Sequence, residues 1–192
     1  EMLLNPSVHV RSILKLNEMF NPDILFMTMD LSIEVEALGL SVFFEPYKHP
    51  KVKSFSVVTD ESLESLNWEG FFRSKRIEGY LKSAEILKNK TDVPLAAYVV
   101  GPLTMTGLLM GISKMKTEIT ENPEFVKKII LRCSELIEEY AVRLQKAGAA
   151  LVVMLEPIAT FLSPEAFYEF CGTYIKKIFN AISANNFFLS VI

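Results

Sequence analysis

The chain has 192 residues, of which 50% are hydrophobic and 22% are charged, and this composition is typical of one folded globular domain. A net charge of −3 and a pI near 5.5 argue against a main role in binding nucleic acid or an anionic membrane. No apolar run approaches the ~20 residues of a membrane span and no signal peptide is visible, so a cytoplasmic location is expected.

The N-terminal part predicts a helix followed by a buried strand. Residues Pro6 to Met19 carry apolar side chains at mixed spacing and are interpreted as a helix that ends near Asn21-Pro22, and Ile24 to Met29 form a short apolar run typical of a strand. The strand finishes on Asp30, so the sequence places a carboxylate directly after its carboxyl end.

A short helix is expected directly after Asp30. It would cover Leu31 to Leu38, with Gly39 ending it in a left-handed conformation and with Glu34 and Glu36 on its outer side. Asp30 is then either the N-cap of this helix, which spacing alone favours, or an acid held at the mouth of a barrel.

The next stretch is less regular. Val42 to Glu45 is a short extended piece, and Lys51 to Asp60 predicts a further extended segment or a hairpin. The proline-rich loop between them contains His49, and a lone histidine in such a loop is more typical of a surface residue than of a ligand. An amphipathic helix follows from Glu69 to Asn89.

Three basic residues, Arg73, Lys75 and Arg76, crowd the start of that helix. Positive charge in a first turn opposes the helix dipole. We therefore interpret these side chains as part of a solvated face. The alternative is that one of them points at an anion.

Pro94 to Val100 is the next apolar strand, and it runs directly into the turn Gly101-Pro102-Leu103-Thr104. Glycine followed by proline makes a tight, rigid turn at the same carboxyl edge as Asp30. Small residues there would let the backbone approach a ligand closely. The alternative is a simple strand-to-helix turn.

Two helices are predicted between this turn and the next strand. The first, Thr106 to Met115, is short and loose, and the second runs from Pro123 to Lys146 with the near-3.6 apolar period of a core-facing helix. Cys133 on the second helix and Cys171 on a later one lie far apart, which favours reduced, packed thiols over a disulfide.

Ala149 to Leu155 is a continuous apolar run typical of a strand buried on both faces, and it delivers Glu156 to its carboxyl edge. Pro157 stops further pairing, and Ser163 caps the predicted helix Pro164 to Ser183. Glu156 is either functional, because ligands of α/β folds bind at this edge, or it is a solvated turn residue or a hydrogen-bond acceptor for a neighbouring loop.

A last strand, Phe187 to Ile192, completes an alternation of strands and helices that predicts a parallel α/β fold, either an open sheet or a barrel. A strand buried on both faces is not the last layer of a finished domain. Because the chain also begins at Glu1 without a methionine, we expect residues 1–192 to form a single partial domain that is truncated at both ends.

Three segments at the strand ends match known sequence patterns. In Asn21 to Gly39, an aspartate follows a first barrel strand and precedes an E-A-L-G helix end. Gly101 to Thr104 fits a G-P-x-T turn, and Ala147 to Phe170 is similar to a segment with an A-G-A-D-x-I strand, an acidic turn and an L-S-P-x-x-F-x-E-F helix start. Together these patterns resemble the uroporphyrinogen decarboxylase superfamily over most of the chain.

The resemblance implies a TIM (β/α)8 barrel, of which this chain would supply roughly the N-terminal half. The superfamily contains decarboxylases of the tetrapyrrole uroporphyrinogen and cobamide-dependent methyltransferases, which pass a methyl group between a corrinoid protein and a thiol. Three departures favour the methyltransferase branch. The decarboxylase segment R-Q-A-G-R-Y is represented only by Arg11, the tyrosine that follows the turn is replaced by Leu108, and the Asp-Ser-Trp turn is replaced by Glu156-Pro157.

That branch implies a corrinoid cofactor and a small thiol acceptor, with a corrinoid protein or a free corrinoid as the partner. Its members use zinc to form the thiolate nucleophile. The His-x-Cys ligands would fall at Ser190 and Ile192, or beyond Ile192 after a shift, so no metal ligand is visible in this sequence.

By the same resemblance, Asp30 and Glu156 are the expected catalytic residues. Asp30 would bind or orient a polar substrate group, and Glu156 would support a metal, a thiol or the substrate. Gly101, Pro102 and Thr104 would form a substrate-binding wall. Two alternatives stay open: a decarboxylase, in which Asp30 would stabilise pyrrole nitrogens and developing positive charge, and a barrel that binds its ligand without catalysis.

Overall fold

The computed structural model describes residues 4–45, 48–182 and 187–191. Its main feature is a four-stranded parallel sheet in the order β1-β4-β5-β6, and β2 and β3 form a separate antiparallel pair. The strands are β1 (Leu25–Phe26), β2 (Val42–Phe43), β3 (Lys51–Val52), β4 (Leu95–Val100), β5 (Leu151–Leu155) and β6 (Phe187–Val191).

Helices occupy most of the chain between the strands. The α-helices are α1 (Pro6–Phe20), α2 (Ile33–Ala37), α3 (Asp60–Glu64), α4 (Lys75–Lys88), α5 (Pro102–Met110), α6 (Ile112–Glu121), α7 (Pro123–Ala147), α8 (Pro164–Phe167) and α9 (Thr173–Ile182). Short helical turns of other types are η2 (Phe71–Arg73), η3 (Pro157–Phe161) and η4 (Tyr168–Gly172).

The central strands β4 and β5 form the core of the sheet. They pair in parallel from Ala96 opposite Leu151 to Val100 opposite Leu155, and most of their side chains are buried. Near-continuous apolar sequence is what a strand covered on both faces requires. The parallel α/β prediction is therefore confirmed.

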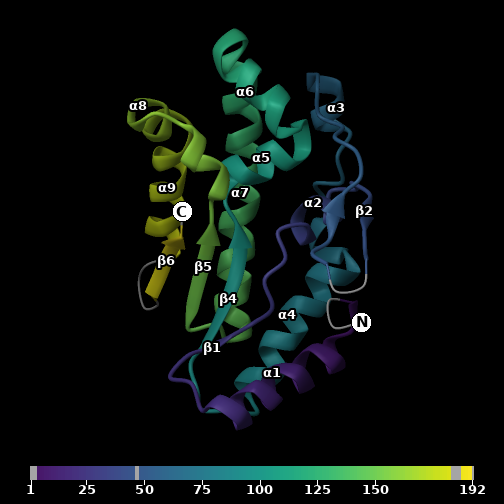
Figure 1. The fold of residues 1–192 in the computed structure, drawn as a ribbon, viewed down its shortest axis with the longest axis vertical. Helices are drawn as coiled ribbons and strands as arrows, with labels where there is room; N and C mark the ends of the chain where they lie inside the picture. Colours follow the sequence, from purple (N-terminus) through teal and green to yellow (C-terminus); the bar gives the residue numbers. More distant parts are fainter. Residues whose placement is uncertain (1–3, 46–47, 183–186, 192) are drawn as a thin grey trace.

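The helices give the sheet its cover and its two distinct ends. Helices α4, α7 and α9 run alongside the sheet, with α7 in contact with β4, β5, α4 and α9 (Figure 1). Helix α1 lies at the end where the strands begin, whereas α5, α6 and α8 lie where they finish (Figure 1). A candidate site at the carboxyl edge is thus surrounded by the helices that follow the strands.

The prediction of a single helix from Thr106 to Met115 is wrong, because the structure has two helices there. Helix α5 begins at Pro102, directly after the turn, and ends at Met110, and α6 begins two residues later. Gly111 separates them with φ at +87°. A left-handed residue cannot continue an α-helix, and glycine takes that conformation without a steric penalty.

Several other elements are shorter than predicted. The strand predicted at 24–29 is only β1, because Leu25 and Phe26 are the residues that pair with β4. The helix predicted at 69–89 starts at Lys75, after the separate turn η2. The helix predicted from Pro164 is divided into α8, η4 and α9, and its predicted end at Ser183 lies outside the described residues, as does Ile192.

Two expectations from composition bear on this fold. Cys133 and Cys171 are both buried and free, as predicted. No helix in the described ranges combines the length and the apolar character needed to cross a membrane. The described strands form an open sheet that does not close on itself, so barrel closure stays a prediction.

Candidate functional site

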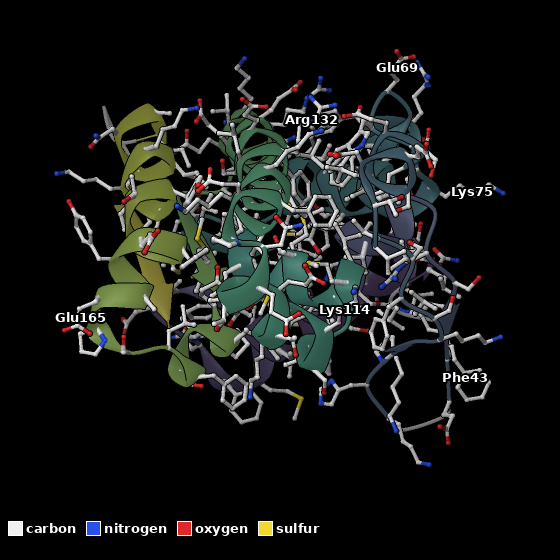
Figure 2. The ribbon with its side chains drawn as sticks, turned by 90° about the horizontal axis from the view of Figure 1, so that it is seen from above. Phe43, Glu69, Lys75, Lys114, Arg132 and Glu165 are labelled. Atoms are coloured by element: carbon white, nitrogen blue, oxygen red, sulfur yellow. The ribbon has the colours of Figure 1, made fainter. Side chains whose placement is uncertain are left out.

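The predicted site residues come together at the carboxyl edge of the sheet. Strands β1, β4 and β5 are neighbours in that order, and Asp30, Gly101 and Glu156 follow them in the chain. Figure 2 views the molecule from above, with Glu165 of α8 at one side and Phe43 of β2 at the other. The parallel arrangement brings to one edge the segments that the sequence separates.

Glu156 is fully buried and is held by the turn that follows β4. Its Oε2 accepts a hydrogen bond from the Leu103 N–H at 2.9 Å, and its Oε1 accepts hydrogen bonds from the N–H and the hydroxyl of Thr104. The interpretation of Glu156 as a solvated turn residue is therefore wrong. In this structure it is the hydrogen-bond acceptor for a neighbouring loop.

The carboxylate of Glu156 occupies the space that a side chain at Gly101 would need. A Cβ atom at Gly101 would lie 2.2 Å from Oε2 and 2.5 Å from Cδ of Glu156. The close approach that the sequence predicted for a ligand is thus made here by a carboxylate of the chain itself. Pro102 lies at the first position of α5. The N–H and the hydroxyl of Thr104 both donate hydrogen bonds to Glu156.

Burial dominates the electrostatics of Glu156. Loss of hydration raises the pKa of its carboxyl to about 7, and the hydrogen bonds from Thr104, Leu103 and the Cys171 thiol act in the opposite direction. Burial also raises the pKa of Cys171, and the Glu156 charge adds to that shift. Neither group is exposed to a substrate in the described structure.

Asp30 is not the N-cap of the following helix, although spacing alone favoured that role. Helix α2 begins at Ile33 with Ser32 as its cap residue. Asp30 Oδ1 instead accepts hydrogen bonds from the Ser32 N–H at 2.9 Å and from the Ser32 hydroxyl at 2.7 Å. Its Oδ2 is paired with Nη2 of Arg76, and the Asp30 side chain is only 2% exposed.

The prediction of a solvated face at the start of α4 holds for Arg73 and Lys75, which are exposed, and is wrong for Arg76. Its side chain is 5% exposed and binds two acids, Asp30 through Nη2 and Glu36 through Nη1 at 2.6 Å. For Arg76 the alternative interpretation is the correct one, because its side chain points at two carboxylates. The unfavourable position of a first-turn arginine was the sequence signal for it.

Glu34 is a buried carboxyl group that the sequence placed on the outer side of its helix. It is 2% exposed, and its Oε1 accepts a hydrogen bond from the N–H of Val100, the last residue of β4, at 3.0 Å. Its Oε2 has no hydrogen-bond partner among the described residues. Burial raises the pKa of Glu34 to about 7; the nearby Asp30 charge adds to this shift, and the Arg76 charge opposes it.

A hollow of about 550 Å³ opens beside Asp30. The helix α5 residue Leu108 and the α6 residue Ile112 line it, together with segments before α2 and around β3. Its apolar lining is Met29, Leu31, Val52, Phe55, Leu108 and Ile112, and its polar lining includes Asp30, Ser32, His49 and Lys51. His49 is exposed, as predicted, and belongs to this lining.

The described residues do not fit a zinc site. Across 4–45, 48–182 and 187–191, no group of three or more His, Cys, Asp or Glu side chains is placed to hold a metal ion. Ser190 belongs to β6, and Ile192 lies outside the described residues. The carboxylates at this edge hold other parts of the chain instead.

The arrangement offers an apolar, partly enclosed surface with one buried acid at its side. Each carboxylate oxygen has two acceptor positions. Oδ1 of Asp30 uses both on Ser32, whereas Oδ2 receives one hydrogen bond, from Arg76, within the part of the chain that the structure describes. Asp30 lines the hollow, although its carboxylate is only 2% exposed.

Comparison with known proteins gives a consistent family. A family model described as uroporphyrinogen decarboxylase (URO-D) matches residues 1–190. The uroporphyrinogen decarboxylase of Thermodesulfovibrio yellowstonii is 25% identical over 189 residues, which cover 94% of this chain and 54% of that protein. That of Drosophila virilis is 26% identical over 167 residues, which cover 83% of this chain and 42% of that protein.

Among solved structures, a methyltransferase from Methanosarcina mazei matches with a TM-score of 0.90 at 20% sequence identity. The match covers 100% of this chain and 58% of that protein. At this identity the likeness shows the fold alone. The chain spans about half the length of the curated relatives it matches.

Proposed function

The chain belongs to the uroporphyrinogen decarboxylase (URO-D) family, and on this premise we propose that it is a methyltransferase-like member that moves a methyl group between a corrinoid and a thiol acceptor. The family is one of enzymes. The choice within the family rests on the chemistry of the hollow beside Asp30.

The apolar lining of that hollow is the observation that carries the proposal. Besides Pro50, six of its lining residues are apolar, and Met29, Phe55 and Ile112 are 41%, 54% and 38% exposed. A methyl group is apolar, and transfer to a thiolate proceeds best away from water, because hydration weakens the nucleophile. A surface of this kind favours a methyl-bearing ligand over a highly charged one.

The residues of this chain would bind and orient the reactants. Leu108 and Ile112 would exclude water from the methyl group, and the second acceptor position on Asp30 Oδ2 would orient a polar group of the substrate. Glu156 and the turn Gly101 to Thr104 would not contact the reactants. They would fix the start of α5, the helix that carries Leu108.

A corrinoid would supply the reactive methyl group, and the apolar side chains around the hollow suit its apolar face. The described residues do not suit zinc, so no step of the reaction is assigned to a metal here.

Uroporphyrinogen decarboxylation is the second candidate, because the curated relatives named above carry that activity in their names. A tetrapyrrole with several carboxylates needs several cationic partners, which are usually arginine or lysine. The hollow offers Lys51 and the titratable His49, and Arg76 is already paired with two acids. The lining therefore favours the methyltransferase.

Two assays on the protein at its full natural length test the proposal. We expect methylcobalamin to be consumed when a small thiol is added, and no release of carbon dioxide from uroporphyrinogen. Release of carbon dioxide without methyl transfer would establish the decarboxylase. Binding of methylcobalamin with neither reaction would indicate a barrel without catalysis.

Substitution in the hollow gives a sharper test. Leu108→Asp places a charge on the apolar wall, and we expect methyl transfer to fall at least ~10-fold, because the loss of ~1.4 kcal/mol of favourable burial is tenfold in rate. Leu131→Asp is the matched control, since Leu131 lies on α7, is 42% exposed and does not line the hollow. Equal activity in both variants would show that the hollow is not part of the active site.

A further inference from the structure

Arg76 joins two parts of the chain that carry the candidate site. It lies in the first turn of α4. Of its two acid partners, Asp30 precedes α2 and Glu36 lies within α2. Its Nη1 also donates a hydrogen bond to the Ser32 hydroxyl at 3.3 Å, and the same hydroxyl donates to Asp30. The guanidinium group and Ser32 therefore hold Asp30 from two sides.

The geometry uses the planar fork of arginine. Nη1 and Nη2 bind different acids, and Nε has no partner among the described residues. The guanidinium carbon lies 5.1 Å from the centroid of the Phe44 ring, which fixes the plane further. A lysine has one compact charge and cannot reach both acids in fixed directions.

Arg76 and Asp30 differ in their access to the hollow. Asp30 lines it, whereas Arg76 does not, so the two side chains have separate roles. Both are nearly buried, at 5% and 2% exposure, and the direction of the Asp30 carboxylate is therefore set by its partners and not by solvent. Its second acceptor position on Oδ2 depends on where Nη2 lies.

We propose that Arg76 is a positioning residue for Asp30, one that aims the second acceptor position of Oδ2 into the hollow without touching the substrate. The proposal rests on the proposed function only in that Asp30 acts on the substrate. It holds for methyl transfer and for decarboxylation alike.

The kinetic test compares Arg76→Met, Arg76→Lys and Lys75→Met in whichever reaction the wild-type protein catalyses. We expect Arg76→Met to lower kcat about 100-fold with little change in KM, because a displacement of a positioned group by about 1 Å costs that much. Arg76→Lys keeps the charge, so its kcat should lie between those of the wild type and Arg76→Met. Lys75→Met is the control, since Lys75 is exposed and extends away from the molecule (Figure 2).

Chemical rescue separates positioning from stability. In Arg76→Ala, added methylguanidinium should restore part of kcat, and it should restore none in Asp30→Asn. Loss of activity in Arg76→Lys and Arg76→Met that follows only the loss of folded protein, without rescue, would overturn the proposal.

A readout that needs no activity keeps this proposal distinct from the proposed function. The carboxyl ¹³C NMR signal of Asp30, identified by its loss in Asp30→Asn, should move in Arg76→Met and stay in place in Lys75→Met. If the wild-type protein catalyses neither reaction, the proposed function has failed and the NMR result alone decides. An unmoved Asp30 signal in Arg76→Met would contradict the assignment.

Discussion

Glu34 and Glu156 are buried carboxyl groups in different hydrogen-bonding situations. Glu156 accepts three hydrogen bonds from the turn, at least one on each oxygen, whereas Glu34 receives one donor from Val100, and its Oε2 has no partner within the described ranges. An unpartnered, ionised oxygen in a buried site is costly. Burial raises the pKa of both Glu34 and Glu156 to about 7, because loss of hydration favours the protonated form, and a proton on Glu34 also lowers the cost of its unpartnered oxygen.

This predicts the pH dependence of stability. Between pH 4.5 and about 7 the folded state holds a proton on Glu34 that the unfolded state releases, so the free energy of unfolding should fall as the pH rises through this window. A shift of this size corresponds to roughly 3 kcal/mol. In Glu34→Gln this component should be absent, as urea unfolding at a series of pH values would measure.

Other titrating groups do not obscure the comparison. Burial lowers the pKa of His9 to about 4, so His9 contributes stability that is lost as the pH falls from 6.5 towards 4, and Glu156 contributes in the same direction as Glu34. Both are present in wild type and variant, and they cancel in the difference. Glu78→Gln, at an exposed position of α4, is the control; an unchanged difference between wild type and Glu34→Gln across the window would show that Glu34 titrates normally.

At the scale of elements, the turn that connects β4 to α5 is held by the side chain of Glu156, which follows the next strand, β5. The turn Gly101 to Thr104 wraps the carboxylate of Glu156, which follows β5, and Ile158 N–H donates to the Thr104 hydroxyl at 3.3 Å. The start of α5 is therefore fixed by the segment after β5. Helix α5 in turn carries Leu108 into the hollow.

Gly101→Ala tests how this turn is held. The new Cβ would meet the Glu156 carboxylate at 2.2 Å, so the carboxylate must move and its hydrogen bonds to the turn must lengthen or break. We expect the free energy of unfolding to fall by about 3 kcal/mol, the sum of overpacking and weakened buried hydrogen bonds. The midpoint of urea unfolding measures it.

Gly172→Ala is the matched control for that variant. Its Cβ would lie 3.4 Å or more from its neighbours, within ordinary contact distance, and its backbone is not left-handed. Its stability should remain within about 1 kcal/mol of the wild type, since alanine favours helical backbone over glycine. Equal losses in the two variants would mean that the carboxylate of Glu156 does not limit the space at Gly101.

At the scale of the whole molecule, the described sheet is open and leaves apolar side chains near one end exposed. β1 forms an edge of the sheet, and Phe26 within it is 42% exposed. Met19 and Phe20, at the end of α1, are 62% and 69% exposed. Exposed edges and apolar patches favour association with other chains.

We therefore expect the polypeptide of residues 1–192 by itself to self-associate, as light scattering after size-exclusion chromatography would show. Phe20→Glu should reduce the association, because it replaces a large exposed apolar side chain with a charged one. Tyr168→Glu should not, because Tyr168 is 71% exposed and directly follows α8, which lies at the end where the strands finish (Figure 1). A monomer at high protein concentration, or the same response from both variants, would count against this surface.

Much of the architecture could be predicted because it depends on local pattern. The apolar run at 149–155, the helix over 123–147 and the acids that follow the strands are all readable from residue type and period. The boundaries near the N-terminus were predicted less well. Pairing there is confined to Leu25 and Phe26. In the middle of the chain, a break at Gly111 divides one predicted helix.

The sequence by itself thus determined the fold class and the placement of Asp30 and Glu156 at one edge of a parallel sheet. Only the tertiary structure decided what those acids contact. Arg76 reaches Asp30 across 46 residues, Glu156 reaches Leu103 across 53 and Glu34 reaches Val100 across 66. Helix and strand periods repeat every few residues and carry no information on such pairs, so the partners of a buried carboxylate are set by packing, which alone decides whether it binds a ligand or holds the chain.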